Sequence, residues 1–247
     1  MRSSRCPGLV VLTGAGISRE SGLATFRDGD GLWAHEHIED VATPEGFRRD
    51  PARVHAFYNA RRAELATVVP NAAHRALAEL ERAWGARGGE FLLVSQNIDD
   101  LHERAGSRRL LHMHGALRQG RCLRCRGVSA WPGDMGTDSV CPACGRAGGM
   151  RPNVVWFGEV PIGMGEIGAA LEECGLFVSI GTSGSVYPAA GFVAEVQGRA
   201  RTVELNLEPS AGVVLFDEAR HGPATQVVPA FVAELLAEGR ASAAALD

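Results

Sequence analysis

Short apolar runs alternate with amphipathic segments along most of the chain. The apolar runs contain many β-branched residues, as strands buried on both faces do, and they cover residues 8–12, 90–97, 175–183 and 201–208. Between them, apolar residues recur at spacings of three and four, which predicts helices at 70–84, 162–174, 189–197 and 229–238. Strands that alternate with helices predict an α/β fold with a parallel sheet covered on both faces. The tail from Gly239 is expected to fray.

Two segments interrupt this alternation. Residues 29–66 contain helix signals without a strand, among them Asp50 as an N-cap before Pro51 at the first helical position. Residues 117–150 are rich in Gly, Cys and Arg and have little periodicity. We interpret both as insertions that form a smaller second domain. The large domain would then consist of residues 1–28, 67–116 and 151–247.

The composition is that of a globular protein. Hydrophobic residues make up 45% and charged residues 22% of the 247 positions. The net charge of −4 does not indicate the basic surface that binds nucleic acid. No apolar run reaches the roughly 20 residues of a membrane span, and the one near the N-terminus is too short for a signal peptide. We therefore expect a cytoplasmic monomer that binds neither nucleic acid nor membranes.

Each predicted strand ends in small polar residues. The ends read TGAGIS, SQNIDD, GTSGS and NLEPS, and in a parallel sheet they would meet at the edge where ligands bind. They predict one nucleotide-sized pocket. Gly14-Ala15-Gly16 begins a dinucleotide-binding fingerprint, but Arg19 occupies the place of the third glycine. The alternative is an ordinary tight turn between a strand and a helix.

Four cysteines have the spacing C-x2-C-x15-C-x2-C of a zinc site: Cys122, Cys125, Cys141 and Cys144. Four thiolates complete a tetrahedron and leave no open position for water, so such a zinc would be structural. Two disulfides or a redox pair are the alternatives, and a cytoplasmic setting disfavours disulfides. Cys174, just before a strand, is expected to be a core thiol. The metal would then need neither His112 nor His114.

The segments SQNID and HMHG bring amide, carboxylate and imidazole groups to the same predicted pocket. Gln96, Asn97 and Asp99 follow a strand, and His112 and His114 come shortly afterwards. Histidine can accept a proton near neutral pH, while amides and carboxylates can orient a hydroxyl, a water or a carboxamide. Each histidine could instead be a structural residue with satisfied hydrogen bonds.

Read in order, several motifs together resemble the sirtuin family. They are GAGISRESGLATFRDGDGLW, SQNID, HMHG, the cysteines, PNVVWFGE, GTSGSVYPAAGF and VELNLEP, and they span about residues 9–231. The chain looks most like the bacterial CobB-type branch, which is related to the desuccinylating sirtuins. The resemblance implies a Rossmann-like large domain and a small domain made of a zinc ribbon and a helical insertion. It also implies NAD-dependent removal of acyl groups from protein lysines, with nicotinamide and O-acyl-ADP-ribose as products and one structural Zn²⁺.

The resemblance also implies roles for individual residues. The histidine before glycine, here His114, would be the general base, with Asn97 beside the reacting groups, while His112 receives no role. The residues implied to bind NAD are Gly14, Ala15, Gly16, Ile17, Thr25, Phe26, Arg27, Trp33, Gln96, Asn97, Ile98, Asp99, Gly181, Thr182, Ser183, Asn206, Leu207, Glu208 and Ala224.

Tyr58 and Arg61 are three positions apart, so they share one face of a predicted helix. A guanidinium beside a phenol can hold a carboxylate, although Arg61 could also be a solvated residue of an amphipathic helix. In the family context the pair resembles the acidic-acyl pocket of the desuccinylating branch. Ala42 resembles the small residue that leaves room there for a longer acyl chain. The sequence thus favours acetyl-, succinyl- and also malonyl-lysine as substrates.

Two other functions fit the same motifs. A mono-ADP-ribosyltransferase would use the same pocket with another acceptor, and a non-catalytic module would bind NAD and zinc without turnover. The presence of His114, Asn97 and Asp99 favours an enzyme over such a module. The family resemblance places the substrate peptide as an extended strand between VVWFGE and GSVYPAAGF.

Overall fold

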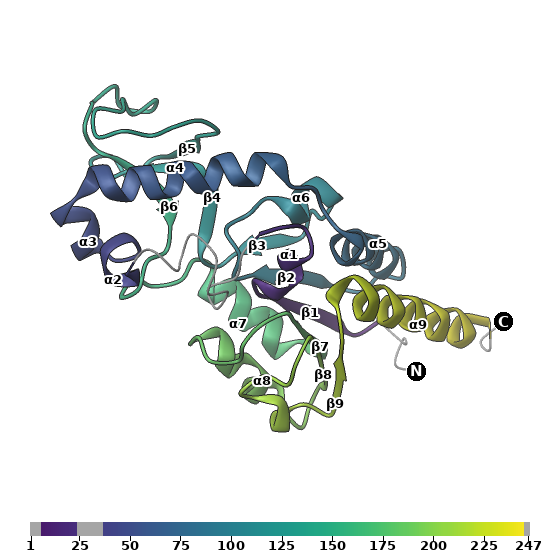
Figure 1. Cartoon of the computed structure of the whole chain (residues 1–247). Helices are drawn as coiled ribbons and strands as arrows, with labels where there is room; N and C mark the ends of the chain where they lie inside the picture. The colour runs from purple at the N-terminus through teal and green to yellow at the C-terminus, as the bar shows by residue number, and fades with distance from the viewer. Residues whose placement is uncertain (1–5, 24–36, 245–247) are drawn as a thin grey trace.

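The computed structural model describes residues 6–23 and 37–244 (Figure 1). The strands are β1 (Gly8–Thr13), β2 (Phe91–Ser95), β3 (Leu110–His112), β4 (Gly115–Cys122), β5 (Val128–Ala130), β6 (Met150–Val154), β7 (Cys174–Ile180), β8 (Arg201–Asn206) and β9 (Glu218–His221). The α-helices are α1 (Gly16–Arg19), α2 (Ile38–Val41), α3 (Pro44–Arg49), α4 (Pro51–Thr67), α5 (Ala72–Ala86), α6 (Leu101–Ala105), α7 (Met164–Glu172), α8 (Phe192–Val196) and α9 (Ala224–Ala244). Short 3-10 helices are η2 (Ala189–Gly191) and η3 (Val213–Leu215).

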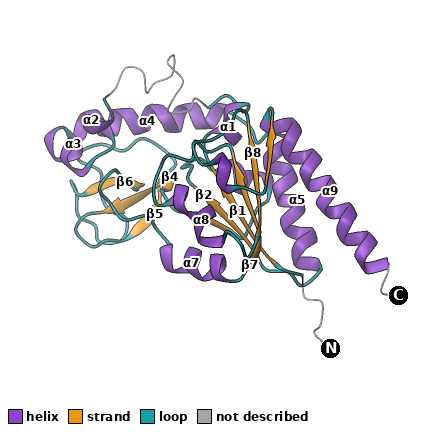
Figure 2. Ribbon diagram, turned by 90° about the horizontal axis from the view of Figure 1, so that it is seen from below, coloured by secondary structure: helices purple, strands orange, loops and turns teal. Residues whose placement is uncertain are grey.

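The large sheet has the strand order β3-β2-β1-β7-β8-β9, and all its neighbouring strands are parallel. Alternate residues of β1 face opposite sides: Leu9 and Val11 join one core, and Val10 and Leu12 join the other. Helices α5 and α9 cover the first face and α7 and α8 the second, as Figure 2 shows. The predicted parallel sheet with helices on both faces is confirmed.

The edge strands β3 and β9 were not predicted, because three residues and the polar run EARH carry too little apolar pattern. The last helix begins at Ala224 instead of Pro229, and it continues to Ala244 beyond the expected fraying point. Its first turn is held by Glu20, whose carboxylate accepts from the backbone nitrogen of Thr225 at 2.9 Å and from its hydroxyl at 2.6 Å. This tertiary contact is invisible in the local sequence.

A second, smaller part of the molecule contains the antiparallel sheet β5-β4-β6 and helices α2, α3 and α4. Asp50 caps α4 by accepting from the backbone nitrogen of Arg53 at 2.9 Å, and Pro51 is its first residue, as the sequence predicts. Helix α4 packs on β4 and β6 through a buried cluster that includes Tyr58 and Trp156. Strand β4 begins at Gly115 and β6 ends at Val154, so the small sheet includes a few residues outside the predicted 117–150 insertion. The domain boundaries remain a prediction.

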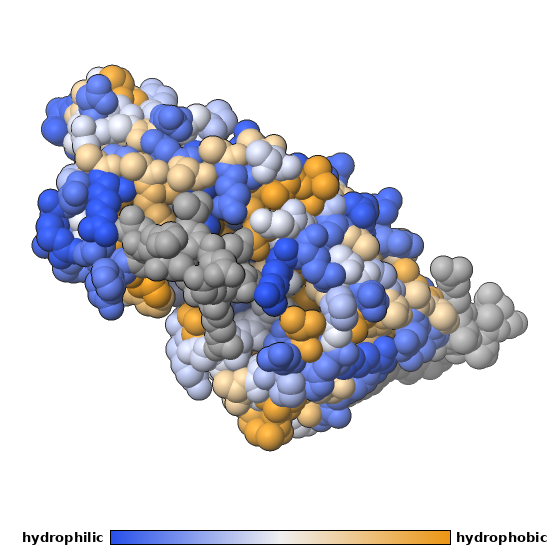
Figure 3. Space-filling view, viewed as in Figure 1, coloured by the Kyte–Doolittle hydropathy of each residue, from blue (hydrophilic) through white to orange (hydrophobic). Residues whose placement is uncertain are grey.

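The outer end of this smaller part, formed by α2 and α3, is largely hydrophilic on the face seen in Figure 3. Among the described residues, no helix is both long and apolar enough to span a bilayer.

Candidate functional site

The candidate site begins where the strand order reverses, between β1 and β7. Such a switch point opens a crevice at the carboxyl ends of the strands. The two loops that leave it touch: the backbone nitrogen of Gly14 donates to the oxygen of Ile180 at 2.9 Å, and that of Gly16 to the oxygen of Gly181 at 2.8 Å. A Cβ on Gly16 would lie 2.7 Å from the Cα of Gly181, so a side chain there would force the loops apart. Ile17 is fully buried in the core, so only its backbone can face the crevice.

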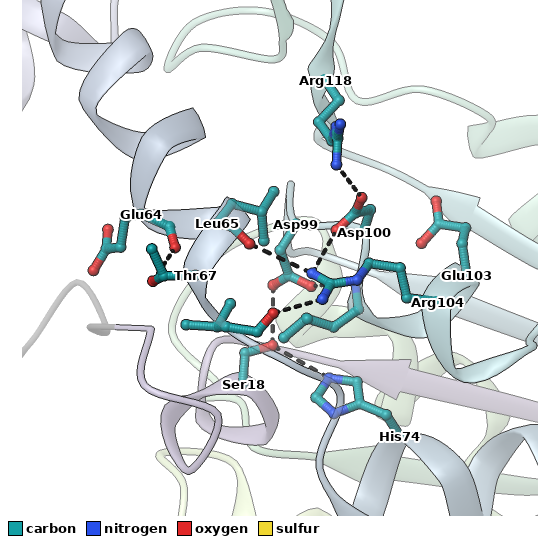
Figure 4. A network of polar contacts seen from close by, with 12 residues as sticks. Ser18, Glu64, Leu65, Thr67, His74, Asp99, Asp100, Glu103, Arg104 and Arg118 are labelled. Atoms are coloured by element: carbon teal, nitrogen blue, oxygen red, sulfur yellow. Dashed lines mark hydrogen bonds and ion pairs between the residues drawn. The ribbon is translucent and has the colours of Figure 1, made fainter. Parts of the chain in front are cut away.

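The loop after β2 is fastened to the loop after β1. The Asn97 side-chain nitrogen donates to the backbone oxygen of Gly14 at 3.0 Å and contacts the Ser18 hydroxyl at 3.3 Å. Ser18 in turn donates to Asp99 Oδ2 at 3.0 Å, as Figure 4 shows. Asp99 also accepts from the backbone nitrogen of Leu101 at 3.1 Å, and burial raises the pKa of this carboxyl. The predicted amide and carboxylate therefore lie in one hydrogen-bonded group.

His112 and His114 both bind this loop through its backbone. His112 Nδ1 lies 2.9 Å from the oxygen of Asn97, and its Nε2 lies 2.7 Å from Glu103 Oε1. His114 Nδ1 lies 2.8 Å from the oxygen of Gln96. A carbonyl oxygen can only accept, so Nδ1 of His114 carries a proton and, in the neutral ring, Nε2 keeps a lone pair. Burial lowers the pKa of His114, against the opposing effect of the Gln96 hydrogen bond.

The ends of β2, β7 and β8 converge through Thr182. Its hydroxyl accepts from the Gln96 side chain at 3.1 Å, and its backbone oxygen accepts from the Asn206 side chain at 2.9 Å. The loops that contain Ser183, Leu207 and Glu208 continue from this junction, and Leu207 is half exposed. Ala224 is the first residue of α9 and packs against the core, next to α1. Thr25, Phe26, Arg27 and Trp33 lie outside the described residues.

Two polar side chains that hold this region were not singled out by the sequence. Ser18 is the contact between Asn97 and Asp99, and His74 Nε2 lies 3.4 Å from the Ser18 hydroxyl. His74 also accepts from the backbone nitrogen of Asn71 at 3.3 Å, and burial lowers its pKa to about 4. The available signal was a histidine on the apolar face of α5, where a polar residue needs a buried partner.

The acyl-pocket candidates all lie in the smaller part of the molecule. Tyr58 and Ala42 belong to one buried cluster with Trp156, and the indole nitrogen of Trp156 donates to the Tyr58 hydroxyl at 2.9 Å. Arg61 is 8% exposed; its guanidinium donates to Glu64 at 3.3 Å and stacks 5.0 Å from the centre of the Phe57 ring. Burial raises the pKa of Tyr58 strongly, and the nearby Arg61 opposes this shift. The hydroxyl is therefore protonated at neutral pH.

Trp156 was not predicted to lie beside Tyr58. Its indole lies under the guanidinium of Arg151, which is 3.3 Å from the ring centre and forms an ion pair with Glu159 at 2.7 Å. Glu159 also accepts from the backbone nitrogen of Trp156 at 2.9 Å. The indole that binds Tyr58 is therefore held against Arg151, and the Trp156 backbone is held by the same Glu159 that pairs with Arg151.

The four cysteines form a candidate metal centre. The sulfur atoms of Cys122, Cys125, Cys141 and Cys144 all lie within 4.8 Å of one another. Two of the sulfur pairs, 122 with 144 and 125 with 141, are 3.9 and 3.7 Å apart. A tetrahedron with zinc–sulfur distances of about 2.3 Å has edges of about 3.8 Å, so the residues fit zinc. All six cysteines are described and free of disulfides, and neither His112 nor His114 belongs to the cluster.

Known proteins that resemble the chain form a consistent set. Residues 14–188 match the model of the Sir2 family. An NAD-dependent protein deacylase of Caulobacter vibrioides is 60% identical over 230 residues, which are 92% of this chain and 96% of that protein. An NAD-dependent protein deacylase of Escherichia coli (strain K12) is 57% identical over 233 residues, 93% of this chain and 82% of that protein.

Solved structures agree with these relatives. A Sir2 homologue in complex with NAD is 37% identical with a TM-score of 0.83, over 94% of this chain and 90% of that one. A Sir2 protein bound to an acetylated peptide is 26% identical with a TM-score of 0.75, over 94% of this chain and 92% of that one.

Proposed function

Because the chain belongs to the Sir2 family, we propose that it is an NAD-dependent protein-lysine deacylase. It removes acetyl and succinyl groups, and malonyl groups as a further substrate. The reaction consumes acyl-lysine, NAD and water, and it gives free lysine, nicotinamide and O-acyl-ADP-ribose. The observation that carries the proposal is His114 beside the loop after β2, which itself binds Gly14 and Thr182 of the switch-point loops. Nδ1 of His114 is hydrogen-bonded to Gln96, and the lone pair of Nε2 is left to accept a proton.

His114 is the general base of this proposal. When bound, NAD supplies an activated ribose carbon that the acyl oxygen of the substrate can attack. His114 then accepts a proton from the ribose hydroxyls at Nε2, so that the 2′-oxygen can attack the former acyl carbon. The Gln96 carbonyl holds the tautomer that this role requires, and a base with a pKa below its usual value is neutral at pH 7. Asn97, fixed between Gly14 and Ser18, orients the groups beside it.

The NAD site of the proposal extends along the crevice. The phosphates lie by Gly14, Ala15 and Gly16, where the loops approach without side chains. Gln96, Asn97, Ile98 and Asp99 serve the nicotinamide ribose and the carboxamide. The family resemblance also assigns NAD binding to Thr25, Phe26, Arg27 and Trp33. The adenosine side is assigned to Gly181, Thr182, Ser183, Asn206, Leu207, Glu208 and Ala224.

The preference for acyl groups with a carboxylate is supported by two buried hydrogen-bond donors on α4, the Tyr58 hydroxyl and the Arg61 guanidinium. The Tyr58 oxygen accepts from Trp156, so its own proton is directed elsewhere, and Arg61 offers a positive charge one helical turn away. A carboxylate, which only accepts hydrogen bonds, matches a phenol proton and a guanidinium. Ala42, 5% exposed in the same cluster, provides the space that a four-carbon acyl chain needs.

A zinc ion on the four thiolates holds the small sheet together and takes no part in the chemistry. The acylated peptide lies between the segment with exposed Phe157 and Val160 and the segment with exposed Val186 and Tyr187. Six free cysteines suit the reducing cytoplasm, and we assign the protein there as a monomer.

The decisive experiment compares removal of acetyl and succinyl groups from one peptide with and without NAD. We expect both to be removed only with NAD, with equimolar nicotinamide and a nucleotide product that has the mass of ADP-ribose plus the acyl group. A protein that instead gains ADP-ribose would identify a mono-ADP-ribosyltransferase. NAD binding without release of nicotinamide would identify a non-catalytic module.

A further inference from the structure

Both ring nitrogens of His112 face hydrogen-bond acceptors. Nδ1 is 2.9 Å from the backbone oxygen of Asn97, and Nε2 is 2.7 Å from the carboxylate of Glu103. Neither oxygen can donate a proton. A neutral imidazole has one N–H and would turn a lone pair toward one of the two acceptors. Only the imidazolium form satisfies both contacts.

We propose that His112 is a positioning residue that is an imidazolium at neutral pH, anchored by Glu103, and that it holds the Asn97 carbonyl and thereby the loop beside the proposed base. The inference rests on the proposed deacylase function. It assigns opposite protonation states to two histidines two positions apart, because His114 must be neutral to act as a base while His112 must be charged to make both its contacts. His112 touches neither substrate nor NAD in this proposal.

The groups around His112 favour its charged form. Burial alone would lower its pKa, but the hydrogen bond and charge of Glu103 on α6, the Asn97 carbonyl and the Asp99 carboxylate together raise it. His102, also on α6, faces His112, and burial keeps its pKa well below the usual value, so it adds no competing charge near neutral pH. The His112 side chain is 14% exposed and Glu103 is 45% exposed, so protons can reach the pair.

The carbonyl that His112 holds belongs to Asn97, whose other polar groups bind neighbouring segments. The Asn97 backbone nitrogen donates to the Ser95 hydroxyl at 3.1 Å, and its side chain reaches Gly14 and Ser18. The preceding residue, Gln96, carries the carbonyl that orients His114. A shift of the Asn97 carbonyl would therefore turn the peptide next to the His114 anchor. Misplacement of a reacting group by about 1 Å can cost about 100-fold in rate.

Activity should fall at alkaline pH, because the contact with Glu103 requires the second proton of His112. As pH rises through the pKa of His112, the ring loses the proton that one of its two contacts needs, and kcat should fall. In Glu103→Gln, the side-chain amide can donate to Nε2, so a neutral His112 can satisfy both neighbours. This variant should keep its activity to higher pH, with the alkaline limb moved up by about one pH unit or more.

The test measures kcat for an acetylated peptide between pH 6 and 10 with saturating NAD, each profile scaled to its own maximum. Glu172→Gln, a substitution of the same kind on the exposed face of α7, is the matched control and should follow the wild type. His112→Ala should lower kcat by about 10- to 100-fold while the KM for NAD changes less. A Glu103→Gln profile that coincides with the wild type would overturn the proposal.

Nitrogen NMR of histidine-labelled protein tests the same point without any turnover. At pH 7.5 we expect both ring nitrogens of His112 to be protonated and only Nδ1 of His114. A neutral His112 ring at that pH contradicts the inference even in an active enzyme. A charged ring in a protein without deacylase activity would instead contradict the proposed function and leave the protonation state established.

Discussion

His114 Nδ1 lies 2.8 Å from the backbone oxygen of Gln96, and this bond decides which nitrogen of the ring can act as a base. The geometry arises from the pairing of β3 with β2, which places His112 beside Ser95. His112 is the last residue of β3 and His114 lies in the turn that follows, and the two rings reach the consecutive carbonyls of Asn97 and Gln96. Met113 between them points the other way into the core, where it is fully buried.

Substitution of His114 by alanine should remove nearly all deacylation. A general base of this kind contributes about 10²- to 10⁴-fold, so kcat/KM should fall by at least 100-fold. Folding and zinc content should remain, because the side chain lies outside the metal cluster and its one bond is to a backbone oxygen. The measurement is nicotinamide release with acetyl and succinyl peptides, together with zinc stoichiometry. Activity above about a tenth of the wild-type value would exclude His114 as the base.

The sequence predicted the parallel sheet because its central strands are buried on both faces and read as continuous apolar runs. It predicted the metal cluster because the spacing of the cysteines alone defines such a site. The strand ends also converged as expected, with Gln96 and Asn206 both bound to Thr182.

What the sequence did not predict depends on contacts between distant segments. Ser18 and Asp99 are 81 residues apart, and Tyr58 and Trp156 are 98 apart. Strand β4 contains the polar run RQG, and its partners β5 and β6 lie before and after the second cysteine pair, so their pairing left no local pattern. The helix that begins at Ala224 shows the same limit, because a contact with Glu20 fixes its first turn.

Substitution of Arg61 by methionine should separate succinyl from acetyl substrates. A charge-assisted hydrogen bond contributes roughly 1.5–3 kcal/mol, so the KM for a succinyl peptide should rise about 10- to 100-fold. Activity on the acetyl peptide should change little, since an acetyl group has no carboxylate. Arg53→Met is the matched control, because Arg53 lies on the same helix and is bound to Asp40 at 3.2 Å on a more exposed surface. An equal loss for both peptides would reject the acyl-pocket role.

Loss of the metal should affect the acyl pocket as well as the cysteine cluster. Met135 packs against Cys122 and Cys141, and it exchanges two hydrogen bonds of 3.0 Å with Asn59 on α4, the helix of Tyr58 and Arg61. Cys144→Ala should lose its zinc and raise the KM for succinyl peptide more than that for acetyl peptide. Cys174→Ala, a buried thiol outside the cluster, should retain one zinc per chain. Full succinyl activity in a zinc-free Cys144→Ala protein would contradict this coupling.

His74 should make the fold less stable in acid. Its Nδ1 accepts from the backbone nitrogen of Asn71, so a proton added there would face another N–H group. Burial accordingly lowers its pKa to about 4, whereas an unfolded chain has about 6.5. The unfolded state thus binds more protons between these values, and the stability that neutral His74 contributes is complete above pH 6.5 and is lost as pH falls toward 4. The shift of about 2.5 units corresponds to about 3 kcal/mol.

The measurement is the free energy of unfolding in urea at pH 7, 6, 5 and 4, with zinc content followed in the same samples. His74→Gln should be less stable than the wild type at pH 7, because a buried contact is altered, yet its stability should decline less on acidification. His37→Gln, at an exposed histidine before α2, is the control and should keep the wild-type slope. His102 shifts in the same direction as His74, and its ring lies 4.8 Å from that of His74, whose charge lowers the pKa of His102 further. The difference in slope between the wild type and His74→Gln therefore includes this coupling between the two rings. Parallel curves for the wild type and His74→Gln would show that His74 does not carry this pH dependence.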